Sequence, residues 1–194
     1  MFLERKNTRQ EKNGWIEVIC GSMFSGKTEE LIRRLKRAEI AGQKLMIFKP
    51  SIDNRYAEDK VVSHDEKSLK SMAVQKAGDI MQYIDDDVEV IGIDEAQFFD
   101  DEIVTVVNDL ANLGIRVIVA GLDMDYRGKP FGPVPHIMAI AEFVTKVHAI
   151  CTRCGNLANY SHRKALSDDL VLLGTQNEYE PLCRKCFNEL NQQA

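Results

Sequence analysis

The sequence has no long apolar run and no excess of basic residues. No segment approaches the roughly 18 apolar residues that a membrane-spanning helix needs, and the N-terminus, MFLERKNTRQEKNG, lacks the apolar core of a signal peptide. Its 25 Lys and Arg are outnumbered by 30 Asp and Glu, which gives a net charge of −5. A broad nucleic-acid-binding face is normally basic, so this balance argues against one. We therefore expect a cytoplasmic protein that binds neither membrane nor nucleic acid.

No tract of biased composition interrupts the chain, and no internal repeat is visible. With 194 residues, 44% hydrophobic and 28% charged, the composition is that of a globular protein with one good core and room for a small appendage. The four histidines show no catalytic pattern, so we expect them at the surface or in packing. They are His64, His136, His148 and His162.

The segment CGSMFSGKTEE has the pattern of a loop that binds the phosphates of a nucleotide. Glycines let backbone N–H groups face the phosphates, Lys27 brings a positive charge, and the Thr28 hydroxyl can ligate Mg²⁺. A strand-like run, WIEVIC, precedes the loop and a helical pattern follows it, which disfavours a chance match. The loop alone leaves open whether the terminal phosphate goes to water, drives a motion or reaches a second substrate. The predicted phosphate-binding residues are Gly21, Ser22, Met23, Phe24, Ser25, Gly26, Lys27 and Thr28.

A second motif supports the first. The run VEVIGIDEAQFF has the form of a buried strand that ends in an acid, and Asp94 would hold the hydration shell of Mg²⁺. The neighbouring Glu95 could accept a proton from either a water or a substrate hydroxyl. The alternative is that Glu95 only caps the next helix or faces solvent.

The order of the patterns predicts an α/β fold with a parallel sheet. Apolar runs at 15–20, 44–50, 88–95 and 115–122 alternate with helical patterns at 27–42 and 101–114, and 77–84 could form a short helix. The strand runs are almost continuous in Val, Ile and Leu, as expected when both faces of a sheet are covered. A polar stretch follows at 51–70, and its second half, VVSHDEKSLK, is predicted to be a mobile insertion or a hairpin at the sheet edge. We expect a polar tail over 1–14, an ATP-binding domain over 15–148 and a small metal-bound domain over 149–194.

Four of the five cysteines form two Cys-x-x-Cys pairs near the C-terminus. In a reducing compartment such pairs favour metal over disulfides, and four thiolates suit a closed, structural Zn²⁺ site. Disulfides and an iron–sulfur cluster are the alternatives. Residues 144–194 contain six Lys and Arg and five acids, and this near balance of charge disfavours a nucleic-acid-binding zinc ribbon. The zinc is expected to hold together the two ends of the loop between the pairs. The fifth cysteine, Cys20, is expected to be a small buried residue of the core. The predicted ligands are Cys151, Cys154, Cys183 and Cys186.

From Trp15 to about residue 190 the chain resembles the thymidine kinases of the tetrameric, zinc-containing type found in bacteria and animals. The resemblance rests on GSMFSGKT, DNRY, DEAQFF, GLDMDYRGKPFG and the two cysteine pairs flanking LVLLGTQNEYEPL, in that order. Each motif alone is shared more widely. The resemblance implies a recombinase-like P-loop core that transfers a phosphoryl group from ATP to the 5′-hydroxyl of thymidine. It also implies a homotetramer and suggests feedback by thymidine triphosphate.

The resemblance also assigns roles to residues. It implies that Glu95 is the general base, that Lys27, Thr28 and Asp94 serve ATP and Mg²⁺, and that Gln97 borders the nucleotide. Asp53 and Arg55 match positions near the metal and phosphates. The segment between the cysteine pairs is similar to the family's lasso, which closes over thymine and reads it mainly through backbone groups. For several of the aromatic residues, core packing is the alternative. The residues expected around the acceptor are Phe98, Tyr126, Phe131, Val171, Leu172, Leu173, Gly174, Thr175 and Tyr179.

Two further function classes remain on the residues alone. One is an ATPase with a zinc-ribbon nucleic-acid-binding accessory, in which Glu95 activates water. The other is a nucleotide-binding switch without catalysis, against which the adjacent pair Asp94 and Glu95 argues.

Overall fold

The structure is a computed structural model, and it describes residues 13–51, 60–62, 68–164 and 178–191. Its centre is a six-stranded sheet in which every neighbouring pair of strands is parallel. The parallel α/β core predicted from the sequence is thus confirmed. In spatial order the strands are β5 (Met72–Val74), β2 (Leu45–Pro50), β6 (Val90–Ile93), β7 (Arg116–Gly121), β1 (Trp15–Cys20) and β8 (Phe143–Lys146).

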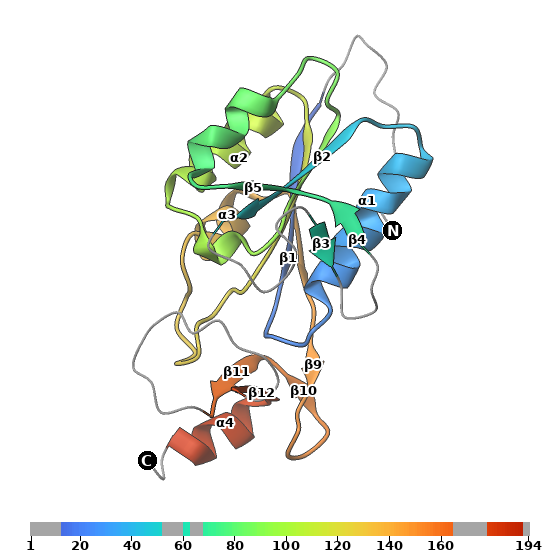
Figure 1. Cartoon of the computed structure of the whole chain (residues 1–194). Helices are drawn as coiled ribbons and strands as arrows, with labels where there is room; N and C mark the ends of the chain where they lie inside the picture. Colours follow the sequence, from blue (N-terminus) through green and yellow to red (C-terminus); the bar gives the residue numbers. More distant parts are fainter. Residues whose placement is uncertain (1–12, 52–59, 63–67, 165–177, 192–194) are drawn as a thin grey trace.

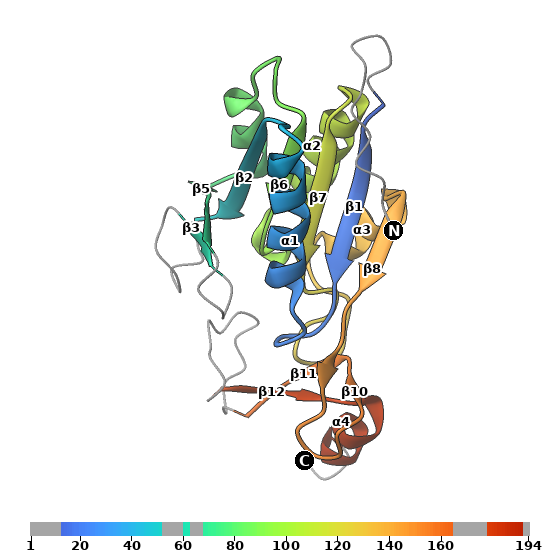
Figure 2. The same ribbon diagram turned by 90° about the vertical axis from the view of Figure 1, so that its right-hand side faces the viewer.

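Helices cover both faces of this sheet (Figure 2). On one face α1 (Lys27–Ile40) buries Leu31, Ile32 and Leu35 against β1, β2, β6 and β7. On the other face lie α2 (Glu102–Asn112), α3 (Val134–Ile140) and the 3₁₀ helix η1 (Ala77–Tyr83). Because both faces are covered, the central strands are apolar almost throughout, which is why the sequence revealed them.

The strands that the sequence did not predict lie at the two edges of the sheet. At one edge, β5 has three residues. At the other, β8 has four, of which Phe143 and Val144 are exposed. Short, half-exposed strands carry no continuous apolar run. The predicted hairpin appears as an antiparallel pair, β3 (Lys60–Val62) with β4 (Ser68–Lys70), although much of that stretch is outside the described residues.

A small unit follows at the carboxyl ends of the sheet strands (Figure 1). It has its own cluster of buried residues, in which the Tyr160 and Phe187 rings are stacked with centroids 4.4 Å apart. We call it the cysteine unit; its division from the core near residue 149 stays a prediction. Its elements are β9 (Ala149–Ile150), β10 (Leu157–Ala158), β11 (Tyr160–Arg163), β12 (Tyr179–Leu182) and α4 (Arg184–Asn191).

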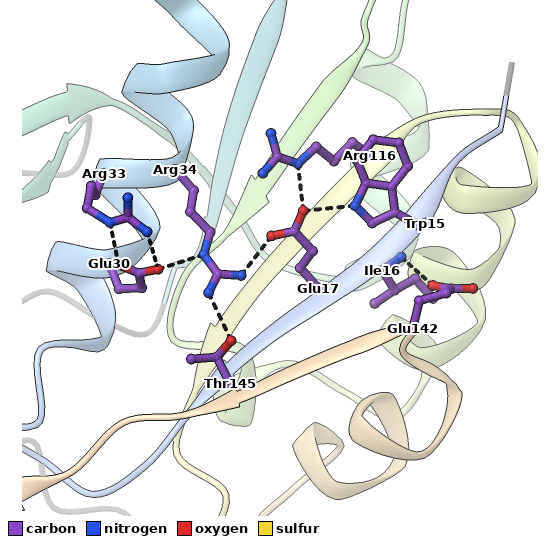
Figure 3. A network of polar contacts seen from close by, with 9 residues as sticks. All are labelled: Trp15, Ile16, Glu17, Glu30, Arg33, Arg34, Arg116, Glu142 and Thr145. Atoms are coloured by element: carbon purple, nitrogen blue, oxygen red, sulfur yellow. Dashed lines mark hydrogen bonds and ion pairs between the residues drawn. The ribbon is translucent and has the colours of Figure 1, made fainter. Parts of the chain in front are cut away.

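A buried ionic network attaches α1 to the sheet (Figure 3). Glu17, in the middle of β1, is fully buried and accepts hydrogen bonds from Arg34 Nη1 of α1 and Arg116 Nε of β7, both at 2.7 Å. Arg34 also donates to Thr145 of β8. Burial alone would raise the pKa of Glu17, but the two guanidinium groups and the Trp15 indole N–H lower it. A buried carboxylate is tolerated only when paired in this way, so the network fixes how the helix after the phosphate loop lies on three strands.

Among the described residues, no helix is both long enough and apolar enough to span a bilayer.

Candidate active site

The predicted phosphate loop lies at the carboxyl end of β1, where parallel α/β proteins bind their ligands. Gly21, with φ 145°, approaches Val147 so closely that a Cβ would lie 2.2 Å from that carbonyl oxygen. Gly26, with φ 83°, is the left-handed N-cap of α1. Phe24 has a φ of 63° although it is not glycine, and such strained residues cluster at ligand sites. The loop therefore has the irregular backbone expected of a phosphate cradle.

Lys27 lies across this loop. Its Nζ donates to the carbonyl oxygen of Ser22 at 2.7 Å. Burial lowers the pKa of Lys27, while the negative charges of Glu95, Asp94 and Asp123 act in the opposite direction. A phosphate group would supply the compensating charge that a desolvated ammonium lacks.

Asp94 directly follows β6 and faces the start of α1. Its Oδ2 accepts a hydrogen bond from the Thr28 hydroxyl at 3.2 Å, and its side chain is buried. Burial raises the pKa of Asp94 to about 7, and the charge of Glu95 adds to this effect. A carboxylate and a hydroxyl are oxygen ligands of the kind that Mg²⁺ accepts, and a divalent cation would stabilise the charge that burial disfavours. These two residues thus fit a magnesium site.

Glu95 occupies a strained backbone position beside Asp94. Its φ of 52° is left-handed, which is uncommon outside glycine and costs about 1–3 kcal/mol. The side chain makes no capping hydrogen bond to the short helix η2 (Ala96–Phe98), so the capping alternative finds no support. Instead Gln97 Nε2 donates to Glu95 Oε2, and Gln97 Oε1 accepts the N–H of Leu122 at 2.9 Å. In the structure Gln97 thus links Glu95 to Leu122, and the role beside the nucleotide that the resemblance implies for it stays a prediction.

The four predicted acceptor aromatics that the structure describes form two pairs. Phe98, three residues after Glu95, packs edge to face with Phe131, and the ring centroids are 6.0 Å apart. Tyr126 and Tyr179 come from different units and meet at the guanidinium of Arg163. The remaining predicted site residues lie outside the described residues: Asp53, Arg55, Val171, Leu172, Leu173, Gly174 and Thr175.

The cysteine unit packs directly on the phosphate loop. The Met23 N–H donates to Ser161 Oγ at 2.9 Å, and the Ser22 hydroxyl donates to the Ala158 carbonyl at 3.4 Å. The Phe24 side chain packs against the buried cluster of the cysteine unit. A ligand whose phosphates occupy the loop would therefore lie next to this unit.

The four predicted metal ligands come together. The sulfur atoms of the two cysteine pairs all lie within 4.8 Å of one another, and every cysteine is a free thiol rather than a disulfide. Although burial opposes it, backbone N–H groups of Cys183, Arg153 and Cys154 lower the pKa of Cys151 to about 6, which favours the thiolate that binds metal. Four sulfurs with no open position suit a structural Zn²⁺.

Sequence reasoning missed several polar residues of the site. Lys146 Nζ and Asp123 Oδ2 form an ion pair at 2.5 Å where β8 ends. Asp123 Oδ1 is buried and has no hydrogen-bond partner among the described residues. Ser161 and Arg163 lie in YSHRK, a stretch without any recognisable motif. Only the tertiary contacts reveal these residues, because each partner is far along the chain.

The strand, phosphate loop and helix, followed by a buried strand that ends at a magnesium-type carboxylate, define a P-loop nucleotide-binding protein of phosphoryl-transfer type. The family model described as thymidine kinase matches residues 14–187. The chain therefore belongs to the thymidine kinase family, whose members are ATP-dependent nucleoside kinases.

Bacterial relatives are similar over most of their length. A thymidine kinase of Bacteroides thetaiotaomicron is 57% identical over 187 residues, covering 96% of this chain and 94% of the relative. One from Porphyromonas gingivalis is 54% identical over 96% of this chain and 91% of the relative. One from a Rhodothermus species is 59% identical over 90% and 81% respectively.

The raised pKa of Asp94 predicts a pH-dependent stability. Because the pKa is raised to about 7 in the folded protein, folding disfavours the charged form, and the free energy of unfolding falls as pH rises from about 4 to about 7. Asn cannot ionise. We therefore compare the free energy of unfolding of Asp94→Asn with that of wild type, without Mg²⁺ and nucleotide. The difference, variant minus wild type, should be larger at pH 8 than at pH 5 by on the order of 2 kcal/mol. Urea unfolding at both pH values measures this; an equal stability difference at both would contradict it.

The cysteine cluster predicts about one Zn²⁺ per chain. Elemental analysis should find it in wild type and in Cys20→Ala, which changes a buried cysteine that is not part of the cluster. The Cys154→Ser protein should lose most of the metal and should unfold at lower temperature. A wild-type protein that is free of metal and fully active would refute the zinc assignment.

Proposed function

We propose that this protein transfers the γ-phosphate of ATP to the 5′-hydroxyl of thymidine, with deoxyuridine as a further acceptor, in nucleoside salvage. The observation that carries the proposal is the placement of Glu95. It is held in a strained conformation next to the buried Asp94, and Gln97 fixes its carboxylate. A carboxylate constrained in this way suits a general base for a hydroxyl.

Each part of the phosphate site has a role in this proposal. The loop and Lys27 bind the β- and γ-phosphates, and Thr28 with Asp94 would hold Mg²⁺, which supplies charge neutralisation when bound. Glu95 accepts the proton of the 5′-hydroxyl as that oxygen bonds to the γ-phosphorus and the bond to ADP breaks. Lys27 stabilises the charge on the transferring group. Glu95 is therefore protonated at the end of the step, which accounts for the proton of the hydroxyl and for the charge.

Contacts around the phosphate loop support a nucleoside as acceptor. The cysteine unit packs against the loop through Ser161 and Ala158 rather than projecting away from it. A wall on that side favours a small acceptor and excludes water. In the ATPase alternative this unit would bind nucleic acid. Membership of the thymidine kinase family does not favour that alternative.

Several finer points stay proposals. We infer that the segment between the cysteine pairs closes over the base as in the family, and that Zn²⁺ holds its two ends. A homotetramer accords with the exposed Phe143 and Val144 on edge strand β8. Feedback by thymidine triphosphate and a cytoplasmic location rest on the family alone.

A nucleoside panel tests the proposal. With Mg²⁺ and ATP, thymidine should give its 5′-monophosphate, and other deoxynucleosides except deoxyuridine should react poorly. Chromatography of the products measures this. Failure to phosphorylate any nucleoside, or ATP turnover that depends on DNA or RNA, would overturn the kinase proposal.

Glu95→Gln tests the base. It should bind ATP and thymidine with wild-type affinity, because the amide keeps the shape of the side chain. Its kcat should fall by about 10²- to 10⁴-fold. Glu102→Gln, on the exposed first turn of α2, is the matched control and should stay within about twofold of wild type. A near-normal kcat for Glu95→Gln would remove Glu95 from this role.

A further inference from the structure

Arg163 is a buried cation that contacts two aromatic residues from different units. It ends β11, and its side chain is 7% exposed. Its guanidinium carbon lies 3.8 Å from the centroid of the Tyr126 ring, while its Nε and Nη2 donate to the Tyr179 hydroxyl at 3.1 and 2.8 Å. A buried guanidinium needs such partners, and they are thereby held relative to one another.

Tyr126 lies at the tip of a tight hairpin-like loop. The loop is closed by the Phe131 N–H on the Asp123 carbonyl at 3.1 Å and by the Asp125 N–H on the Lys129 carbonyl at 2.8 Å. We call residues 123–131 the acceptor hairpin. Its base lies next to the residues around Glu95, because the Leu122 N–H donates to Gln97 Oε1 and Phe131 packs on Phe98.

The tip of the acceptor hairpin rests on the cysteine unit. At Gly128, with φ 74°, an added Cβ would lie 2.9 Å from a ring carbon of Tyr160, so backbone and ring are in direct contact. Met124 also packs against the buried cluster of that unit. The hairpin thus spans from Glu95 to the cysteine unit, and Arg163 holds its tip.

Tyr179, the other partner, begins β12. It pairs with Arg163 across the two antiparallel strands, and the Lys164 N–H donates to the Glu178 carbonyl at 2.8 Å next to them. The guanidinium of Arg163 therefore links the strand pair of the cysteine unit, through Tyr179, to the acceptor hairpin, through Tyr126.

We propose that Arg163 is a positioning residue for the nucleoside: it clamps Tyr126 and Tyr179 together and so sets the separation of the acceptor pocket's walls. Its guanidinium contacts are with the two tyrosines, which the resemblance places around the acceptor rather than at the phosphates. Its loss should therefore weaken acceptor binding more than ATP binding or the chemical step. This inference rests on the proposed function.

Arg163→Lys is the informative variant, because lysine keeps the charge but has no planar fork to stack on one ring and bond the other hydroxyl. We expect the KM for thymidine to rise about tenfold, which corresponds to about 1.4 kcal/mol. The KM for ATP should stay within about twofold of wild type, and kcat should fall less than the KM rises. Zinc content should match that of wild type.

Arg184→Lys is the matched control. Arg184 is exposed and lies over an aromatic ring that is not a wall of the proposed pocket, with its guanidinium carbon 5.4 Å from the centroid of Tyr160. The same exchange there should change the thymidine KM less than about twofold, because an exposed cation–π contact is weak. In addition, Tyr126→Leu should raise the thymidine KM. In the double variant with Arg163→Lys the KM should rise little further, because the contact between Arg163 and Tyr126 is already lost.

The outcomes separate this inference from the proposed function. A wild-type protein that phosphorylates no nucleoside overturns both. An active wild type with an unchanged thymidine KM in Arg163→Lys overturns the positioning role alone. So does a variant that loses zinc, or whose ATP and thymidine KM values rise together, because Arg163 would then only support the fold.

Discussion

The contact between the phosphate loop and the cysteine unit is the constraint on which the site depends. The Met23 N–H on Ser161 Oγ and the packing of Phe24 join two separate clusters of buried residues across the loop itself. On its other side the loop is continuous with α1, which the buried Glu17 network fixes to three strands. The loop therefore cannot move independently of either part. A metal bound by the four cysteines would act on the phosphate site through the same contact.

The electrostatics of the site follow from burial. Asp94 and Lys27 are desolvated close to each other, so the pKa of the acid rises and that of the base falls. Both shifts oppose the charged forms that ATP and Mg²⁺ would use. Binding of a magnesium nucleotide would reverse both effects at once, because it brings a cation to Asp94 and phosphate charge to Lys27. The site is thus arranged to favour metal and nucleotide together.

The sequence predicted the parts of the protein that are encoded locally. The phosphate loop, the run ending at Asp94 and the cysteine pairs each have their chemistry within a few residues, and the central strands are apolar because both faces are covered. The edge strand β8 is half exposed and gave no such signal. Glu17 was hidden inside an apolar run, since a buried acid is tolerated only through partners 17 and 99 residues away. Arg163 has no motif, and its role depends on Tyr126, which lies on another unit.

We propose that the terminal phosphate of ATP goes to a hydroxyl and not to water. ³¹P NMR can follow both phosphate products as the protein consumes ATP with excess thymidine. Transfer to the hydroxyl should give one nucleoside monophosphate for each ADP, almost no inorganic phosphate, and very slow ATP loss when thymidine is omitted. Inorganic phosphate formed in step with ADP, at a rate that thymidine does not change, would contradict it.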